Sequence, residues 1–91
     1  MPKLYEYFGL IVMFYANEHE PVHVHGKSQG REARAEFIII NGVINEIHYA
    51  NEMRYFKEIV SHKSDEIIAK WIDFFVLHKS ITSENITRRL K

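Results

Sequence analysis

The chain has 91 residues, which is enough for a single domain, residues 1–91, and too few for two. Lysine plus arginine and aspartate plus glutamate number 12 each, so the formal net charge is zero. A protein that binds nucleic acid mainly by neutralising phosphates would carry a basic excess, so the balance disfavours that class. The chain has no cysteine, which excludes disulfides and thiolate zinc sites.

The first predicted element is a central strand over residues 8–16, because this run is apolar on both faces and rich in β-formers. The run is too short to cross a bilayer and lacks the features of a signal peptide, so we expect a cytoplasmic protein without membrane association. Residues 17–21 break the pattern and end on a proline. Residues 22–26 then alternate valine and histidine, which sends His23 and His25 to the same face of a second strand.

Residues 27–30 are predicted to form a turn, followed by a half-buried strand over residues 31–40. Its alternation places small and apolar side chains toward the core and leaves a charged back made of Glu32, Arg34 and Glu36. If the two strands pair through the turn, this charged back adjoins the histidine face.

Asn41-Gly42 is the strongest hairpin signal in the chain. A two-residue turn would set Phe37 opposite Glu46. A three-residue loop with a left-handed glycine would instead put Phe37 on the face of Ile47. We favour the three-residue loop because it keeps the charge of Glu46 out of the core.

After residue 47 the apolar period becomes helical. Asn51 is the predicted N-cap of a first helix, and Ser64 starts a second helix that His78-Lys79 closes. Residues 81–91 are predicted to be a polar, frayed tail. The order of elements predicts an α+β fold, in which a small antiparallel meander of about four strands is packed on one face by two C-terminal helices.

Three histidines near the second strand are the first candidate for chemistry. His23 and His25 lie about 7 Å apart on one strand face, and His19 precedes the strand. Three imidazoles there would suit a divalent transition metal. Direct catalysis or polar substrate binding by His23 and His25 is a second interpretation. The third interpretation is that His23 and His25 are half-exposed strand residues that bind no ligand.

The charged back of the next strand is the second candidate. Histidines beside Glu32, Arg34 and Glu36 are the groups that acid/base cleavage of a phosphodiester needs, since histidine moves the proton and arginine stabilises charge on phosphate. The alternative is a solvated sheet face with weak charge pairs. Four further residues are interpreted as packing at the edge of the core, with stacking or phosphate contacts as the alternative: Tyr15, Tyr49, Tyr55 and Arg31.

Several motifs together resemble a family catalogued only as the small bacterial domain-of-unknown-function family 4160. They are an aromatic-glycine-aliphatic start, a Tyr-x-Asn-Glu-His step, a Pro-x-His-x-His strand, and a histidine-then-acidic helix with a tryptophan: Phe8-Gly9-Leu10-Ile11-Val12, Tyr15-Ala16-Asn17-Glu18-His19, Pro21-Val22-His23-Val24-His25, and His62-Lys63-Ser64-Asp65-Glu66 with Trp71. The resemblance implies a short cytoplasmic protein, often encoded beside a second small protein in arrangements that look like toxin–antitoxin pairs.

The same resemblance implies which residues carry function: His19, His23 and His25, with Asn17 and His62 behind them. Two hypotheses follow. In the first, the chain is a binding module that pairs with a protein partner encoded nearby, with Glu32 and Glu36 in the binding surface. In the second, it is a ribonuclease-like or metal-dependent hydrolase with RNA as one substrate, in which His23 or His25 is the general base and Arg34 and His19 support it. We favour the first.

Overall fold

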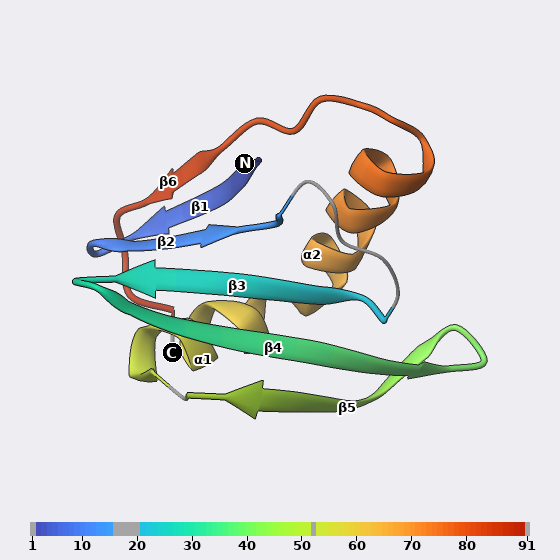
Figure 1. Ribbon diagram of the computed structural model, residues 1–91, viewed down its shortest axis with the longest axis horizontal. Coiled ribbons are helices and arrows are strands. Elements are labelled where there is room, and N and C mark those ends of the chain that lie inside the picture. The colour runs from blue at the N-terminus through green and yellow to red at the C-terminus, as the bar shows by residue number, and fades with distance from the viewer. Residues whose placement is uncertain (1, 16–20, 52, 91) are drawn as a thin grey trace.

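The computed structural model describes residues 2–15, 21–51 and 53–90, which build an α+β fold of one sheet and one helical layer (Figure 1). In chain order, the described elements are β1 (Lys3–Tyr7), β2 (Leu10–Met13), β3 (His23–Ser28), β4 (Arg31–Ile40), β5 (Val43–Ala50), α1 (Arg54–His62), α2 (Ser64–Trp71), η1 (Ile72–Val76) and β6 (Glu84–Ile86). None of the helices in these residues is long and apolar enough to cross a membrane.

The sheet has six described strands in the order β5-β4-β3-β2-β1-β6. All neighbours are antiparallel except β1 and β6, which run parallel. The predicted α+β class is confirmed, and the predicted number of about four strands is too low. The strand expected over residues 8–16 is shorter, because Phe8 and Gly9 have φ of 49° and 84° and form the turn that joins β1 to β2.

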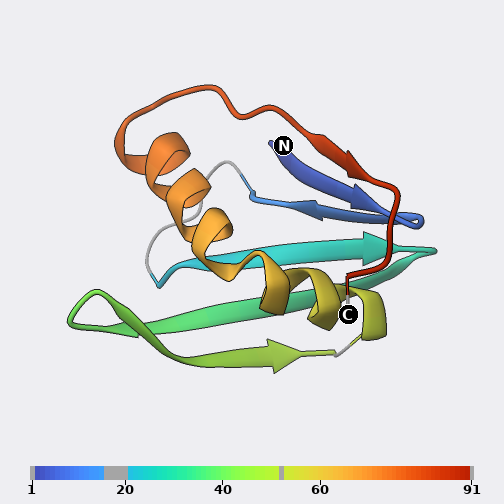
Figure 2. The same cartoon turned by 180° about the vertical axis from the view of Figure 1, so that it is seen from behind.

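Helices α1 and α2 cover one face of the sheet, which lies behind the strands in Figure 1 and is turned toward the reader in Figure 2. The valine face of β3 packs here, since Val24 and Ala35 are fully buried beneath a helical layer that contributes Phe56 and Ile59. Alternation along the strands therefore places His23 and His25 on the other side of the sheet, away from the described helices.

The β4–β5 hairpin differs from the favoured prediction. The residues on either side of Asn41-Gly42 pair directly, and both turn residues have positive φ (52° and 77°), so the connection is a two-residue turn and the three-residue loop is wrong. A bulge then adds Asn45 to β5. Because of this extra residue, Phe37 and Ile47 lie opposite each other on the same side of the sheet, as expected, and Glu46 stays out of the core.

The two helices also differ in detail from the prediction. Asn51 does not cap α1: it has a φ of 56°, and the N-cap is Met53, which is extended and makes no side-chain capping bond. Helix α2 begins at Ser64, as the two acids that follow it predict. It continues into η1, a single π-helical turn, and the cap of that turn at Leu77 comes before His78.

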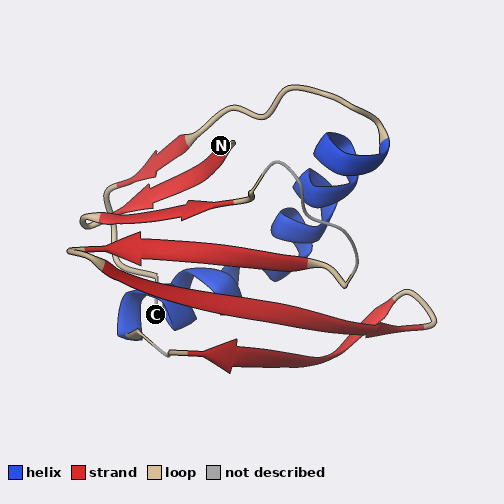
Figure 3. Cartoon of the chain, viewed as in Figure 1, coloured by secondary structure: helices blue, strands red, loops and turns tan. Residues whose placement is uncertain are grey.

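The C-terminal segment contributes a strand, so the predicted frayed tail is wrong for these residues. Figure 3 shows β6 lying along the outer edge of β1, where Ile86 is 9% exposed. Beyond β6, Arg89 donates hydrogen bonds from its guanidinium to both carboxylate oxygens of Glu58 and lies 4.6 Å from the ring centre of Tyr55. The pairing of β6 with β1, the buried Ile86 and the Arg89–Glu58 ion pair therefore all hold the segment to the domain.

The Glu58 carboxylate gives the domain a predicted acid sensitivity. Hydrogen bonds from Arg89 and from the Tyr7 hydroxyl lower the pKa of Glu58 from 4.5 to about 2. The folded state thus favours the carboxylate, and the resulting stability is complete above pH 4.5 and is lost as the pH falls toward 2. We expect the wild-type melting temperature to exceed that of Glu58→Gln at neutral pH, and the gap to close across this window.

The control for this prediction is Glu84→Gln, which removes an exposed carboxylate on β6. Melting temperatures recorded from neutral to acidic pH should run parallel for Glu84→Gln and wild type. A gap between wild type and Glu58→Gln that stays constant down to pH 2 would contradict the assignment.

Candidate functional site

Side chains of β3 and β4 meet on the side of the sheet that carries none of the described helices. In the antiparallel register, His23 is opposite Glu36, His25 is opposite Arg34, and Lys27 is opposite Glu32. The alternation in the sequence predicts this juxtaposition, and the functional roles of the residues stay predictions. We call this surface the open face and define it by Tyr15, His23, His25, Lys27, Glu32, Arg34 and Glu36.

The two histidines of the open face are buried, with 9% of His23 and 8% of His25 exposed, so the interpretation as half-exposed residues is wrong. Their ring centres are 5.2 Å apart in an edge-to-face arrangement. The Nδ1 atom of His23 is 2.7 Å from the carbonyl oxygen of Pro21. A carbonyl can only accept, so Nδ1 carries a hydrogen, and Nε2 is the nitrogen at which the neutral ring takes a proton or a metal.

Tyr15 packs against His25, whereas the sequence indicates for this tyrosine only packing at the edge of the core. Its ring centre is 4.1 Å from that of His25, and its hydroxyl donates to both carboxylate oxygens of Glu32 at 2.7 and 2.8 Å. The hydrogen bond to Glu32 raises the pKa of Tyr15. The Lys27 ammonium lies 5.3 Å from the tyrosine ring centre. Tyr15 lies two residues beyond Met13, which pairs with His25, so the period of two along a strand places the tyrosine on the same face as this histidine.

The rim of the open face toward β5 carries exposed charges. Arg34 and Glu36 form an ion pair at 3.4 Å, with 45% and 30% of their side chains exposed. On β5, His48 lies opposite Glu36, and its Nε2 is 3.1 Å from a carboxylate oxygen of Glu46. The histidines are thus flanked by charged groups that a partner molecule can reach.

Other predicted site residues are not brought to this face. His62 is the last residue of α1, in the helical layer on the opposite side of the sheet, and its Nδ1 is 2.9 Å from the carbonyl oxygen of Glu58. His19 and Asn17 lie outside the described residues. Within residues 2–15, 21–51 and 53–90, no three histidine or acidic side chains form a group suited to a metal. A metal held by His19, His23 and His25 therefore stays a prediction.

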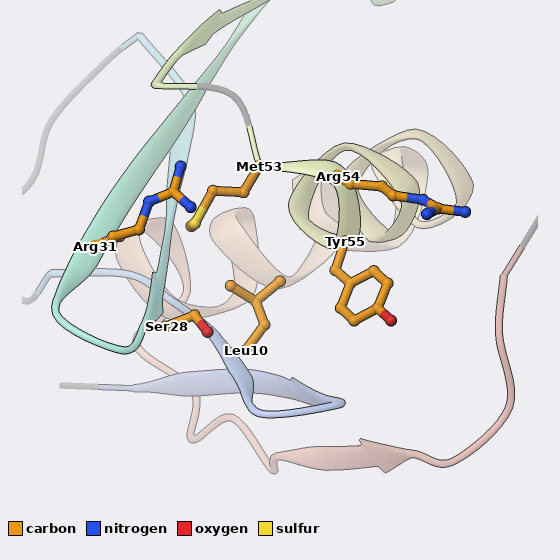
Figure 4. Close-up of a pocket in the computed structure, with 6 residues that line it drawn as sticks. All are labelled: Leu10, Ser28, Arg31, Met53, Arg54 and Tyr55. Carbon is orange, nitrogen blue, oxygen red and sulfur yellow. The ribbon is translucent and has the colours of Figure 1, made fainter.

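A separate hollow of about 340 Å³ lies at the start of α1 (Figure 4). Its lining residues are Leu10, Ser28, Arg31, Met53, Arg54 and Tyr55. The side chain of Arg31 reaches toward Met53, whereas the guanidinium of Arg54 points away from the hollow and lies 3.5 Å from Glu58. The predicted packing residues Arg31 and Tyr55 are thus neighbours of one hollow, and the open-face histidines are not among its lining residues.

The fold and the open face together define a small α+β domain with helices on one side of a mixed sheet and a histidine-bearing charged face on the other. The family model described as Domain of unknown function (DUF4160) matches residues 9–72, more than half of the chain, so the chain belongs to this family. The match runs from the β1–β2 turn to the beginning of η1, which leaves β1 and β6 outside it. No curated protein and no solved structure matches the chain.

Proposed function

We propose that the chain is a binding module of a toxin–antitoxin-like pair in the cytoplasm, and that its open face docks the small protein encoded beside it. The observation that supports this most is the contrast in exposure on that face. His23 and His25 are buried, while Arg34 is exposed and Glu36 is partly exposed. A general base must come within hydrogen-bond reach of its substrate, whereas exposed charges around a packed aromatic centre are what a protein surface recognises.

The charge of the open face supports a protein partner over a nucleic acid. On the open face, Lys27 and Arg34 are balanced by Glu32 and Glu36, so lysine and arginine give this face no excess of positive charge for phosphates. Alternating signs instead select a partner whose own charges are complementary. The neutral overall charge of the chain agrees with this choice.

A hydrolase that acts on RNA is the second candidate, and one observation favours it. His25 lies directly opposite Arg34, and His23 lies directly opposite Glu36. A proton-moving imidazole beside a guanidinium is the pairing that phosphodiester cleavage needs. In this candidate the Nε2 atom of His23 or His25 would act as general base once substrate binding had moved the Tyr15 ring.

Co-expression with the protein encoded beside it distinguishes the two candidates. We expect the tagged chain to capture that protein, and Arg34→Glu to weaken the complex at least about tenfold, because it places like charges against the partner. The matched control is Arg88→Glu, which changes an exposed arginine outside the open face. The same preparations, with His23→Ala added, are incubated with total RNA.

Each outcome decides between the candidates. Capture by wild type and Arg88→Glu, with loss in Arg34→Glu, supports docking on the open face. Equal capture by all three variants, or no capture by any, contradicts it. Cleavage of RNA by wild type that disappears in His23→Ala, without capture of the neighbouring protein, would establish the hydrolase instead.

A further inference from the structure

Strand β5 is the last strand on one side of the sheet, so one of its two edges has no neighbouring strand among the described residues. Among the described strands, none pairs with this side of β5, which is eight residues long, whereas β6 at the opposite edge has three residues. Proteins usually protect a long edge with charged side chains, proline, a bulge or a covering segment, because its free N–H and C=O groups recruit another strand. Residues 43–50 contain no proline or lysine. The bulge at Asn45 interrupts the strand near its start and leaves the rest regular.

Charges on β5 are arranged so that the strand complements itself. Glu46 and His48 are two residues apart on the same face, and 59% of each side chain is exposed. When two copies of β5 run antiparallel with Ile47 facing Ile47, Glu46 of each copy lies opposite His48 of the other. The arrangement therefore creates two pairs of opposite charge when the histidines are protonated, and two hydrogen-bonding pairs when they are neutral.

The side chains on the other face of β5 fit the same register. Ile47 is partly buried and packs against the core beneath the helices. Two facing Ile47 side chains would extend that apolar layer from one copy into the next. A register shifted by one residue, with His48 facing His48, would instead set like groups opposite each other and place Glu46 against Ala50. Charge and apolar packing thus select the same alignment.

We propose that a second copy of this chain docks on the edge of β5, antiparallel, with Ile47 on the twofold axis. The two sheets then form one continuous sheet, and the interface is isologous, so no open edge is left on β5. The inference does not depend on the proposed function, because it uses the strand edge rather than the open face. It has a consequence for that function: the two open faces come to lie side by side on one surface.

Sedimentation equilibrium over a series of protein concentrations tests the pairing. We expect a monomer–dimer equilibrium for wild type. His48→Glu should raise the dissociation constant at least about tenfold, because it places two carboxylates opposite each other twice. Glu46→Lys should also weaken the dimer. The double variant Glu46→Lys/His48→Glu reverses both charges and should regain dimerisation, since each new cation faces a new carboxylate.

The same series of variants includes controls for folding and for the specificity of the charge changes. Circular dichroism and melting temperatures establish that each variant is folded, and Glu84→Lys on β6 provides a charge change at the opposite edge, with no expected effect on the dimer. A wild type that is monomeric throughout overturns the proposal. A dimer that survives His48→Glu, is lost in Glu84→Lys, or is not restored in the folded double variant overturns it as well.

Discussion

Replacing Gly26 with alanine is expected to lower the free energy of unfolding by about 1–3 kcal/mol, as overpacking of a filled core does. A Cβ atom at this position would lie 2.4 Å from Cδ1 and 2.8 Å from Cε1 of Phe56, and 3.2 Å from a methyl carbon of Leu10. Phe56 is fully buried and Leu10 is 2% exposed, so neither side chain can move into solvent. Among the four glycines, Gly26 is therefore the one at which an added Cβ atom would meet neighbouring side chains within 4 Å.

Chemical denaturation of a double-mutant cycle isolates this contact. Phe56→Leu removes the ring atoms nearest to the new methyl group, so Gly26→Ala should cost less in the Phe56→Leu background than in wild type. If the cost is the same in both backgrounds, the clash with the Phe56 ring is not its cause. Ser28→Ala, a partly buried position further along β3, controls for the change in strand propensity.

A chain that stops at Ser83 is expected to lose about 2–4 kcal/mol of stability, with its melting temperature lowered accordingly. The estimate comes from exposing the apolar surface that Ile86 buries and from losing its packing against the core. The shortened chain also lacks the β1–β6 ladder and the hydrogen bond from the backbone N–H of Leu90 to the Tyr7 hydroxyl. A loss of this size is a large part of the stability of a small domain.

Two adjacent arginines provide the matched pair for this experiment. Arg89→Ala removes the ion pair with Glu58 and the contact with the Tyr55 ring, so it should reproduce part of the loss. Arg88→Ala changes an exposed neighbour and should leave the melting temperature unchanged. If the shortened chain melts at the wild-type temperature, β6 and the residues after it contribute nothing to stability and the prediction fails.

Local patterns in the sequence predict β3, β4 and the face that they share. Valine alternates with histidine in β3, and small residues alternate with charged residues in β4. Each pattern can be recognised within a few positions, so the period of two along each strand and the pairing of the two strands suffice to place His25 beside Arg34. The start of α2 at Ser64 is equally local, because acids in a first turn suit the helix dipole. The α+β class then follows from the order of the elements.

The remaining features depend on contacts between distant residues, which no local pattern encodes. Tyr5 and Tyr7 are fully buried on β1, and their hydroxyls donate to carboxylates on the helices, at 2.5 Å to Glu66 and 2.7 Å to Glu58. Burial and the bond to Glu66 raise the pKa of Tyr5, which keeps its hydroxyl protonated as a donor. The contact of the His25 ring with Tyr15 is likewise made by a residue from outside β3.

The parallel pairing of β1 with β6 also sets the order in which the domain can be completed during synthesis. β1 is made first, yet the backbone N–H that binds the Tyr7 hydroxyl belongs to Leu90, 83 positions later. The outer edge of β1 must therefore wait until residues 84–86 have left the ribosome, and closing the long loop of residues 8–83 is slow. During that wait, an unpaired strand edge with Leu4, Tyr5 and Tyr7 is the part of the nascent chain most in need of protection from other chains.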